Sequence, residues 1–337
     1  MSFKKTLRGI EATSRRWDRE EKRRQRELEK QQIQLEKMQE LERAEYEVEV
    51  YENNLDVLMS IHKDCGDILD WETIKSSEPP GKPEVAHEHE EVAQANLKDY
   101  KPSISDKLLN RVDSRREELV NAVRDARQRD KELYKLDIEE YKRICLENQT
   151  KRELAKRINI GDESGYIDAI KFFDPFSEIE EIGSDMHCQI CKNKLLEIFL
   201  KVNSYEVIPR EIKTVLKSGK LSVMDMPKTR FYALYQDYVC GCVLRIGRET
   251  FALLPVDMFL VNAIGELLNS KTGLMEYNPI LSVAISRRNL NRLNFEKLDP
   301  SDAMDNFVHN MKFMKTKGFQ AVEKLNPSDI EPIDFYL

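Results

Sequence analysis

The chain has 337 residues, a length that permits two or three domains. Its hydrophobic fraction of 40% is low and its charged fraction of 34% is high for a globular protein, which is typical of long solvated helices. The net charge of −7 gives no whole-chain case for a nucleic-acid or membrane partner, and no apolar run approaches the ~20 residues that cross a bilayer.

The N-terminal sequence and the cysteine content indicate the cellular compartment. The N-terminus is basic but no apolar segment follows it, so we expect no secretory signal peptide. Six cysteines, two of them inside predicted long helices, do not form a disulfide pattern. Both features favour a cytoplasmic protein.

The chain divides into halves of different character near residue 160. The first half is charge-dense and almost free of glycine, whereas the second contains short β-like segments and turn glycines. We therefore expect an α+β protein in which a long helical hairpin, a coiled coil, precedes a head domain. The predicted parts are a first coiled-coil helix with a basic N-terminus at 1–75, a Pro-rich and acidic linker at 76–102, a second coiled-coil helix at 103–159 and the α+β head at 160–337.

Both predicted coiled-coil helices carry an apolar seam. In the first, the apolar residues repeat at steps of three and four, the spacing of a heptad seam: Leu41, Ala44, Val48, Tyr51, Leu55 and Leu58. In the second, a capping pattern at 103–106 starts a similar seam, which Arg115 and Arg129 interrupt. The lengths and the Pro-rich connection favour an antiparallel hairpin. The alternative is a parallel dimer that uses one of the two helices.

Two groups of polar residues in the first half of the chain, a basic cluster and a pair of histidines, could bind a ligand. The basic cluster near the N-terminus could neutralise phosphates of a nucleic acid, or it could pair with the interleaved acids on a solvated helix. Its arginines are Arg15, Arg16, Arg19, Arg23, Arg24 and Arg26. His87 and His89 have no further ligand in register, so we expect exposed linker residues rather than a metal site.

The head is predicted to contain an antiparallel sheet packed with a long helix and smaller C-terminal helices. Residues 195–202 read as a strand, and a turn at Ser218-Gly219 joins a hairpin. Apolar spacing predicts a long helix from about 228 to Leu254; the alternative is two strands at 238–244 and 250–254. Two further strands, at 256–264 and 280–285, follow.

Three features are predicted for the C-terminal part. Ser286 is expected to cap a short helix. Asp299-Pro300-Ser301-Asp302 has the pattern of a helix start, and apolar residues from Met304 to Met311 would form the inner face of that helix. Residues 318–322 are expected to close the fold as an edge strand.

Two cysteines have the spacing of metal ligands. Cys188 and Cys191 form a C-x-x-C pair that could share one zinc ion. Cys240 and Cys242 could supply the other half, but on a helix they would point about 200° apart. Structural thiols are the alternative that we favour.

Glu211 and Lys213 resemble the E-x-K half of a metal-dependent nuclease centre. In such a centre a carboxylate holds Mg²⁺ and a lysine stabilises developing charge. An additional acid on an adjacent strand is required, and Asp185 or Glu206 could provide it.

No cofactor motif such as G-x-G-x-x-G or G-x-x-x-x-G-K-[ST] occurs. We therefore expect a cytoplasmic, non-enzymatic interaction or scaffold protein without a cofactor, which binds a protein partner or self-associates through the arm and has no membrane contact. The alternatives are a nuclease-like enzyme that requires Mg²⁺ and a nucleic-acid-binding protein that uses the basic N-terminus.

Overall fold

The computed structural model describes residues 40–177, 185–191, 194–217 and 220–330. Its described residues form two compact units: residues 73–155 make up unit 1, and residues 40–72 together with 156–330 make up unit 2. In this part of the chain, no helix combines the length and the hydropathy that a bilayer crossing requires.

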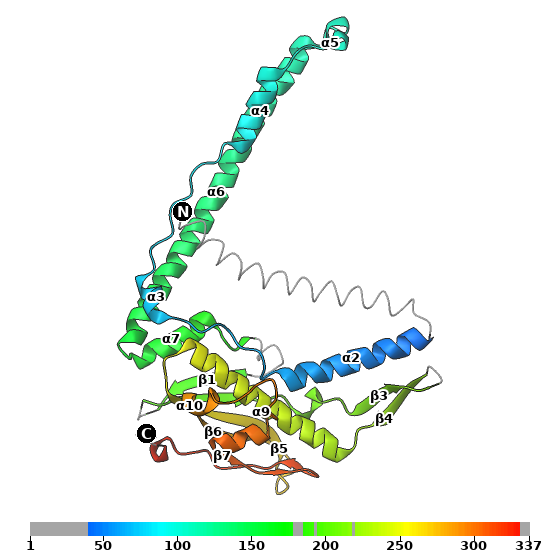
Figure 1. Ribbon diagram of the computed structural model, residues 1–337, viewed down its shortest axis with the longest axis vertical. Coiled ribbons are helices and arrows are strands. Elements are labelled where there is room, and N and C mark those ends of the chain that lie inside the picture. The colour runs from blue at the N-terminus through cyan, green and yellow to red at the C-terminus, as the bar shows by residue number, and fades with distance from the viewer. Residues whose placement is uncertain (1–39, 178–184, 192–193, 218–219, 331–337) are drawn as a thin grey trace. The chain divides into compact units, whose positions relative to one another are not determined.

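Unit 1 is a helical hairpin in which one limb is a continuous helix and the other is partly irregular. Its helices are α4 (Glu88–Asp99), α5 (Ile104–Leu108) and α6 (Val112–Asn159), the last of which continues into unit 2. The chain reverses at α5, so that α4 and the irregular segment before it lie antiparallel along α6 (Figure 1). At 48 residues, α6 is ~72 Å long.

This hairpin differs from the predicted one. Residues 76–102, predicted as a linker, contain α4 and supply the first limb. The predicted first helix is not that limb, since its described portion, α2 (Glu40–Ser60), belongs to unit 2.

Unit 2 consists of helices packed on a five-stranded sheet. Its remaining helices are α7 (Glu163–Phe173), α9 (Lys228–Leu253) and α10 (Arg287–Leu290), with short 3₁₀ turns at Tyr205–Val207, Asp302–Asn306 and Pro327–Asp329. Helix α3 (Trp71–Ser76) begins in unit 2 and ends in unit 1. Its strands are β1 (Asp185–Ile190), β2 (Leu196–Lys201), β3 (Glu211–Val215), β4 (Leu221–Asp225), β5 (Met258–Leu268), β6 (Met275–Ser286), β7 (Val308–Met311), β8 (Phe313–Met314) and β9 (Gly318–Phe319).

The main sheet has the order β1-β2-β5-β6-β7 and is mixed. All neighbours pair antiparallel except β2 and β5, which are parallel. The prediction of an antiparallel sheet is therefore wrong at this pair. The physical reason is the long connection through β3, β4 and α9, because only a crossover can return the chain to a parallel neighbour.

Helix α9 packs across this sheet, as Figure 1 shows in yellow-green, and the predicted long helix is confirmed. Its C-terminal half is almost entirely buried, including Leu244 and Ile246 at 0% exposure. Gly247 permits the close approach to the sheet that the sequence suggests, since a Cβ there would lie 3.3 Å from Cδ1 of Ile285 on β6.

The apolar seam of α2 is buried, but by a sheet and a helix rather than by a second arm helix. Ala44, Tyr51 and Leu58 are at most 8% exposed. The elements that contact α2 are the β3–β4 hairpin and α9.

The segment after α2 is fixed to α9 and α7. Trp71 donates from Nε1 to the Leu253 carbonyl at 2.6 Å, and its ring meets Phe173 edge-on with centroids 5.7 Å apart. The Gly66 amide donates to the Glu249 carboxylate at 3.0 Å. Ile61, His62 and Trp71 of this segment are thus buried in unit 2, whereas the residues between them are half-buried or exposed.

The predicted helix beginning at Asp302 is wrong beyond its first turn. Asp299 Oδ1 does cap that turn, accepting from the amides of Ser301 and Asp302. The turn is 3₁₀, and Val308–Met311 then forms β7 against β6. Tertiary pairing with the open edge of β6 outweighs the local helical pattern.

The predicted cap of α10 is confirmed, since Ser286 Oγ accepts from the Asn289 amide. The predicted edge strand at 318–322 is shorter than expected, because β9 comprises Gly318–Phe319 alone and pairs with β8.

Candidate functional site

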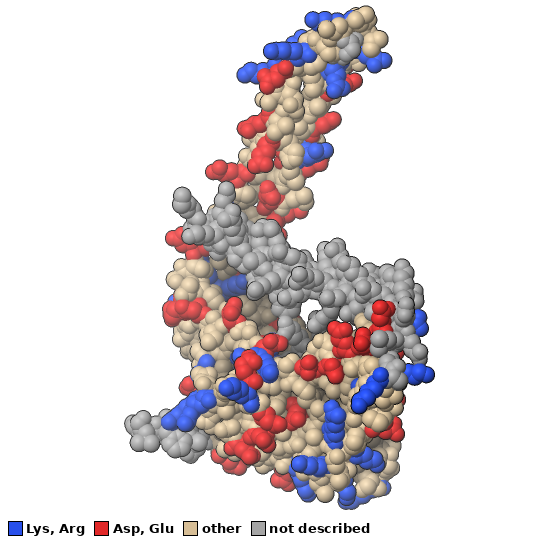
Figure 2. Space-filling model, turned by 45° about the vertical axis from the view of Figure 1, so that its right-hand side comes forward, with Lys and Arg blue, Asp and Glu red and all other residues tan. Residues whose placement is uncertain are grey.

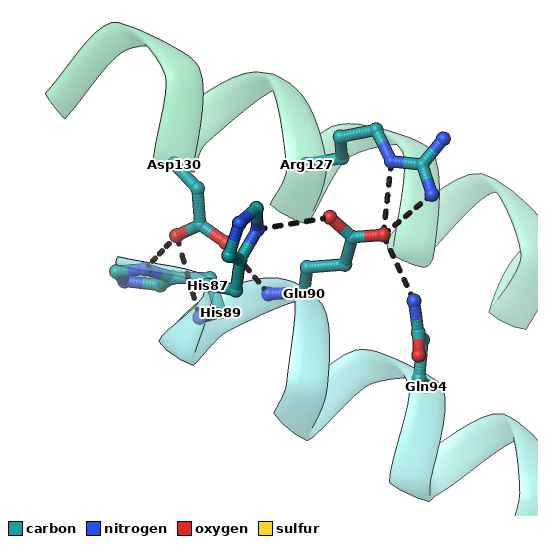
Figure 3. Close-up of polar contacts among 6 residues, drawn as sticks. All are labelled: His87, His89, Glu90, Gln94, Arg127 and Asp130. Atoms are coloured by element: carbon teal, nitrogen blue, oxygen red, sulfur yellow. Dashed lines mark hydrogen bonds and ion pairs between the residues drawn. The ribbon is translucent and has the colours of Figure 1, made fainter. Parts of the chain in front are cut away.

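Two carboxylates occupy the deepest positions where α4 meets α6. Glu90 on α4 is 7% exposed and Asp130 on α6 is 4% exposed. The apolar residues on the same side of α4, Ala93 and Leu97, are only half-buried. The helix contact of unit 1 is therefore centred on charged groups, which Figure 3 shows with their partners.

Asp130 binds the N-terminus of α4 from the facing helix. Its Oδ2 accepts from the Glu90 amide at 2.9 Å, and its Oδ1 accepts from the His89 amide at 3.3 Å. The His89 ring places Nδ1 2.7 Å from the same Oδ1, which requires the tautomer that carries a proton on Nδ1. Asp130 thus satisfies amides that a helix start leaves without partners.

Glu90 uses only one of its oxygens for hydrogen bonds. Oε1 accepts from Arg127 Nε at 2.9 Å, from Arg127 Nη2 at 2.5 Å and from Gln94 Nε2 at 2.8 Å. Oε2 faces Nδ1 of His87 at 3.6 Å, too far for a hydrogen bond. Among the described residues, Oε2 of Glu90 therefore faces the His87 ring without a hydrogen bond.

Hydrogen bonding keeps both carboxylates ionised. The Arg127 guanidinium lowers the pKa of Glu90. Burial raises the pKa of Asp130, but the donors on α4, the Glu90 amide foremost, outweigh it, so the net shift is downward. The cluster therefore carries two negative charges at neutral pH.

The cluster brings together side chains that sequence reasoning kept apart. His87 and His89 were expected in a linker without further ligands; His87 directly precedes α4, and His89 lies within it. In the part of the chain that the structure describes, His87, Glu90 and Asp130 are the group of three metal-ligand side chains whose donor atoms lie within 4.8 Å of one another. Asp130 is 40 positions from Glu90, so no spacing rule could have found it.

The residues of the nuclease hypothesis lie on two different sheets. Glu211 and Lys213 belong to β3 of the two-stranded sheet, whereas Asp185 belongs to β1 of the main sheet. Glu206 lies in the 3₁₀ turn between β2 and β3. Lys213 donates to Glu47 of α2 at 2.9 Å. The structure does not bring these four residues into one group.

In the C-x-x-C pair, the Cys191 thiol forms a hydrogen bond. Cys188 lies on β1, and Cys191 directly follows that strand and donates from Sγ to Glu197 Oε2 at 3.4 Å. Burial and this bond raise the pKa of Cys191 to about 11. Because metals bind the thiolate, this environment opposes zinc binding at neutral pH. Cys240 and Cys242 are buried in α9.

The arginines of the basic cluster, Arg15, Arg16, Arg19, Arg23, Arg24 and Arg26, lie outside the described residues. Their assignment to nucleic-acid binding stays a prediction.

The main sheet contains a polar row that the sequence analysis missed. Glu197 on β2 accepts from Gln189 Nε2 of β1 at 2.7 Å and from Asn262 Nδ2 of β5 at 2.8 Å. Ser282 of β6 donates to Asn262 Oδ1 at 2.6 Å and accepts from the Leu325 amide at 2.9 Å. The charged Glu197 inside an otherwise apolar strand was the available signal. Both carboxylate oxygens have donors, so the row ties strands together.

No protein-family model, no curated protein and no solved structure matches this chain.

Proposed function

We propose that this protein is a non-enzymatic interaction protein that self-associates through the helical hairpin of unit 1, with the α+β unit as its recognition head. The observation that carries the proposal is the exposure of large apolar side chains on α6. Leu133, Leu136 and Leu146 are 44%, 61% and 66% exposed. Apolar side chains left uncovered at helical spacing favour a protein partner.

The chain covers only one stripe of α6 within unit 1. The residues of that stripe are half-buried or buried: Leu119, Val123, Ala126, Asp130, Tyr134, Tyr141 and Ile144. Leu133 and Leu136 are three residues apart and lie beside this stripe, where a further helix would cover them. A helix of this length depends on burial of its apolar face, so a second copy of α6 is the partner that we infer.

The charged side chains on the surface of α4 and α6 favour a partner that also carries both positive and negative charges. Figure 2 shows acidic and basic side chains interspersed with uncharged surface along the face of α4 and α6 that it displays. A surface that carries both positive and negative side chains is suited to another helix with both kinds of charge. A polyanion would instead be attracted by a surface of positive charge alone. A stable interface buries about 1,200 Å² or more, which three leucines alone do not supply, so the contact would extend along much of α6.

Charged side chains of unit 2 that bind the backbone or one another support a head that acts by binding. Arg287 donates to the carbonyls of Phe251, Leu254 and Val256. Arg245 and Glu249 pair at 2.7 Å within α9. These groups hold chain segments in place, which leaves them unsuited to chemistry on a substrate.

Sedimentation equilibrium of the purified full-length protein tests the proposal. We expect a concentration-dependent dimer, and we expect Leu133→Gln with Leu136→Gln to weaken it at least tenfold, because glutamine keeps helix propensity while removing apolar surface. The matched control is Lys131→Gln, whose side chain projects about 160° from Leu133 and about 140° from Leu136 around α6, and which should leave the dimer unchanged. A wild-type protein that stays monomeric at all concentrations contradicts the proposal.

A second candidate is the Mg²⁺-dependent nuclease, favoured by one observation. The antiparallel register places Glu211 of β3 directly opposite Asp225 of β4, and Lys213 is two residues along the same strand. Two carboxylates and a lysine in neighbouring positions are the elements that such an enzyme requires. This candidate predicts nucleic-acid cleavage that needs Mg²⁺ and is abolished by Glu211→Gln. Cleavage that persists in this variant would contradict a nuclease centre at Glu211.

A further inference from the structure

The contact between α4 and α6 is built differently from an ordinary helix contact. Its two most buried side chains, Glu90 and Asp130, carry the same charge. Replacing buried charges with apolar groups of similar volume is often neutral or stabilising, so hairpin stability alone does not account for them. The pair therefore points to a ligand.

The charges at this contact are not balanced by permanent cations. Among the described residues, Arg127 is the cation of fixed charge that contacts the two carboxylates, and it binds Glu90 alone. Asp130 is met by amides of α4, which carry partial charges. Two negative charges against one positive charge leave a site of net negative charge, which attracts a cation.

The donor atoms have the spacing of ligands rather than of a direct hydrogen bond. Nδ1 of His87 and Oε2 of Glu90 are 3.6 Å apart. Two ligands of one tetrahedral metal, each about 2.0–2.1 Å from the ion, lie roughly 3.4 Å apart. A carboxylate oxygen of Asp130 lies within 4.8 Å of both of these atoms, so binding one ion would draw the three donors closer together. Figure 3 shows Nδ1 of His87 facing the Glu90 carboxylate, and the Asp130 carboxylate bonded to His89 and to the Glu90 amide.

We propose that His87, Glu90 and Asp130 bind one divalent transition-metal ion of the Zn²⁺ class. One imidazole and two carboxylates suit such an ion, whereas Mg²⁺ and Ca²⁺ prefer oxygen ligands alone. Three protein ligands leave a position for water. The site lies wholly within unit 1 and does not depend on the self-association proposed above.

The surrounding residues are arranged as supports for these ligands. His89 donates to Asp130 Oδ1, which orients that carboxylate, and Arg127 with Gln94 holds Oε1 of Glu90, which turns Oε2 toward His87. Such outer contacts typically change metal affinity about 10–100-fold. His89 is therefore a positioning residue in this site.

Metal binding would join two segments 40 residues apart in sequence. Because the ion binds the assembled hairpin and not its separated limbs, it would stabilise the contact of α4 with α6. The expected signature is slower amide exchange in α4 when the metal is present.

Isothermal titration calorimetry of the full-length protein with Zn²⁺ tests the site. The background variant Cys188→Ser with Cys191→Ser removes the C-x-x-C pair as a competing ligand. We expect one equivalent to bind in this background, and His87→Ala to weaken binding at least tenfold. His87 is 57% exposed and makes no other polar contact among the described residues, so its loss should leave the fold intact. The control His309→Ala removes a histidine of the head and should change nothing.

Co²⁺ absorption identifies the donors. Nitrogen and oxygen ligands should give weak visible bands without the intense near-ultraviolet transitions of cobalt–thiolate bonds. The proposal is overturned if Zn²⁺ does not bind in the Cys188→Ser, Cys191→Ser background, or if His87→Ala binds as tightly as its parent. It is also overturned if His309→Ala lowers the affinity as much as His87→Ala does.

Discussion

Glu197 lies in β2 at a position where its neighbours Leu196 and Ile198 are buried and apolar. Gln189 is its register partner on β1, and Asn262 is the register partner of Ser282 across β5 and β6. The polar row therefore crosses four strands. A buried carboxylate is stable there because each of its oxygens accepts a hydrogen bond.

Asn262→Ala tests the polar row. The substitution removes a donor from Glu197 and an acceptor from Ser282, and unsatisfied buried groups cost about 1–3 kcal/mol each. We expect the free energy of unfolding to fall by at least ~1 kcal/mol in urea denaturation. Asn291→Ala, at an exposed position, should change it by less than ~0.5 kcal/mol. Equal effects of the two substitutions would contradict the structural role of the row.

The carboxylates of the arm have a defined pH dependence. Because the folded pKa of Glu90 is lowered, its contribution to hairpin stability is fully present above its unfolded pKa of ~4.3 and is lost as pH falls through the folded value. Arg127 is the largest cause of the lowering. Unit 1 is therefore expected to loosen at acidic pH.

Arg127→Ala should raise the pKa of Glu90. Carboxyl chemical shifts followed by NMR as a function of pH measure this directly. Glu140, whose pKa is lowered by Arg143, provides an internal reference and should titrate as in the wild type. An unchanged Glu90 titration would show that the Arg127 contact is not maintained in solution.

The composition of this cluster could be predicted from sequence only in part. His87, His89 and Glu90 are adjacent in the chain, but sequence analysis assigned the histidines to an exposed linker. Asp130 contacts α4 only because the chain reverses at α5. Local residue spacing does not specify which residues of α6 this reversal brings next to α4.

At the scale of elements, the apolar stripe of α2 shows what a sequence pattern can establish. Spacing identified the buried side of the helix, since Ala44, Tyr51 and Leu58 are all buried. It did not identify what covers that side, because a sheet hairpin and a second helix bury the same stripe. The strands β2 to β6 were predicted well, since turns and apolar runs mark them locally. Strands β1, β7 and β8 were missed, and for β7 the reason is that its pairing with β6 is a long-range interaction.

Gly241 in α9 gives a sharp test of the packing between the segment after α2 and this helix. A Cβ at this position would lie 2.9 Å from Cγ2 of Ile61, whose β-branch is stiff. Alanine gains ~1 kcal/mol of helix propensity, but overpacking costs about 1–3 kcal/mol. We expect Gly241→Ala to lower the free energy of unfolding, or at best to leave it unchanged.

The change in the free energy of unfolding caused by Gly241→Ala should reverse its sign when Ile61 is replaced by a smaller residue. In an Ile61→Ala background the obstructing methyl group is gone, so Gly241→Ala should stabilise the protein by ~1 kcal/mol. Chemical denaturation of the four proteins of this cycle measures the coupling. A substitution that is equally destabilising in both backgrounds would show that Ile61 does not pack against α9.

At the scale of the whole molecule, the two units use their buried charges in different ways. In unit 2 they fasten backbone segments, as Arg287 and Glu249 do. In unit 1, Glu90 and Asp130 occupy the contact between helices, and nearby leucines on α6 are exposed. We therefore propose that the hairpin mediates self-association, whereas the buried charges of unit 2 stabilise the recognition head.

The central claim is that α6 is a contact surface between two copies of the chain. Its most direct test is photo-crosslinking with a photoreactive amino acid at position 136, compared with position 131 on the other side of the helix. The account predicts inter-copy crosslinks from position 136 that map to residues 112–159, and none above background from position 131. Crosslinks that are absent at position 136, or equal at both positions, would contradict it.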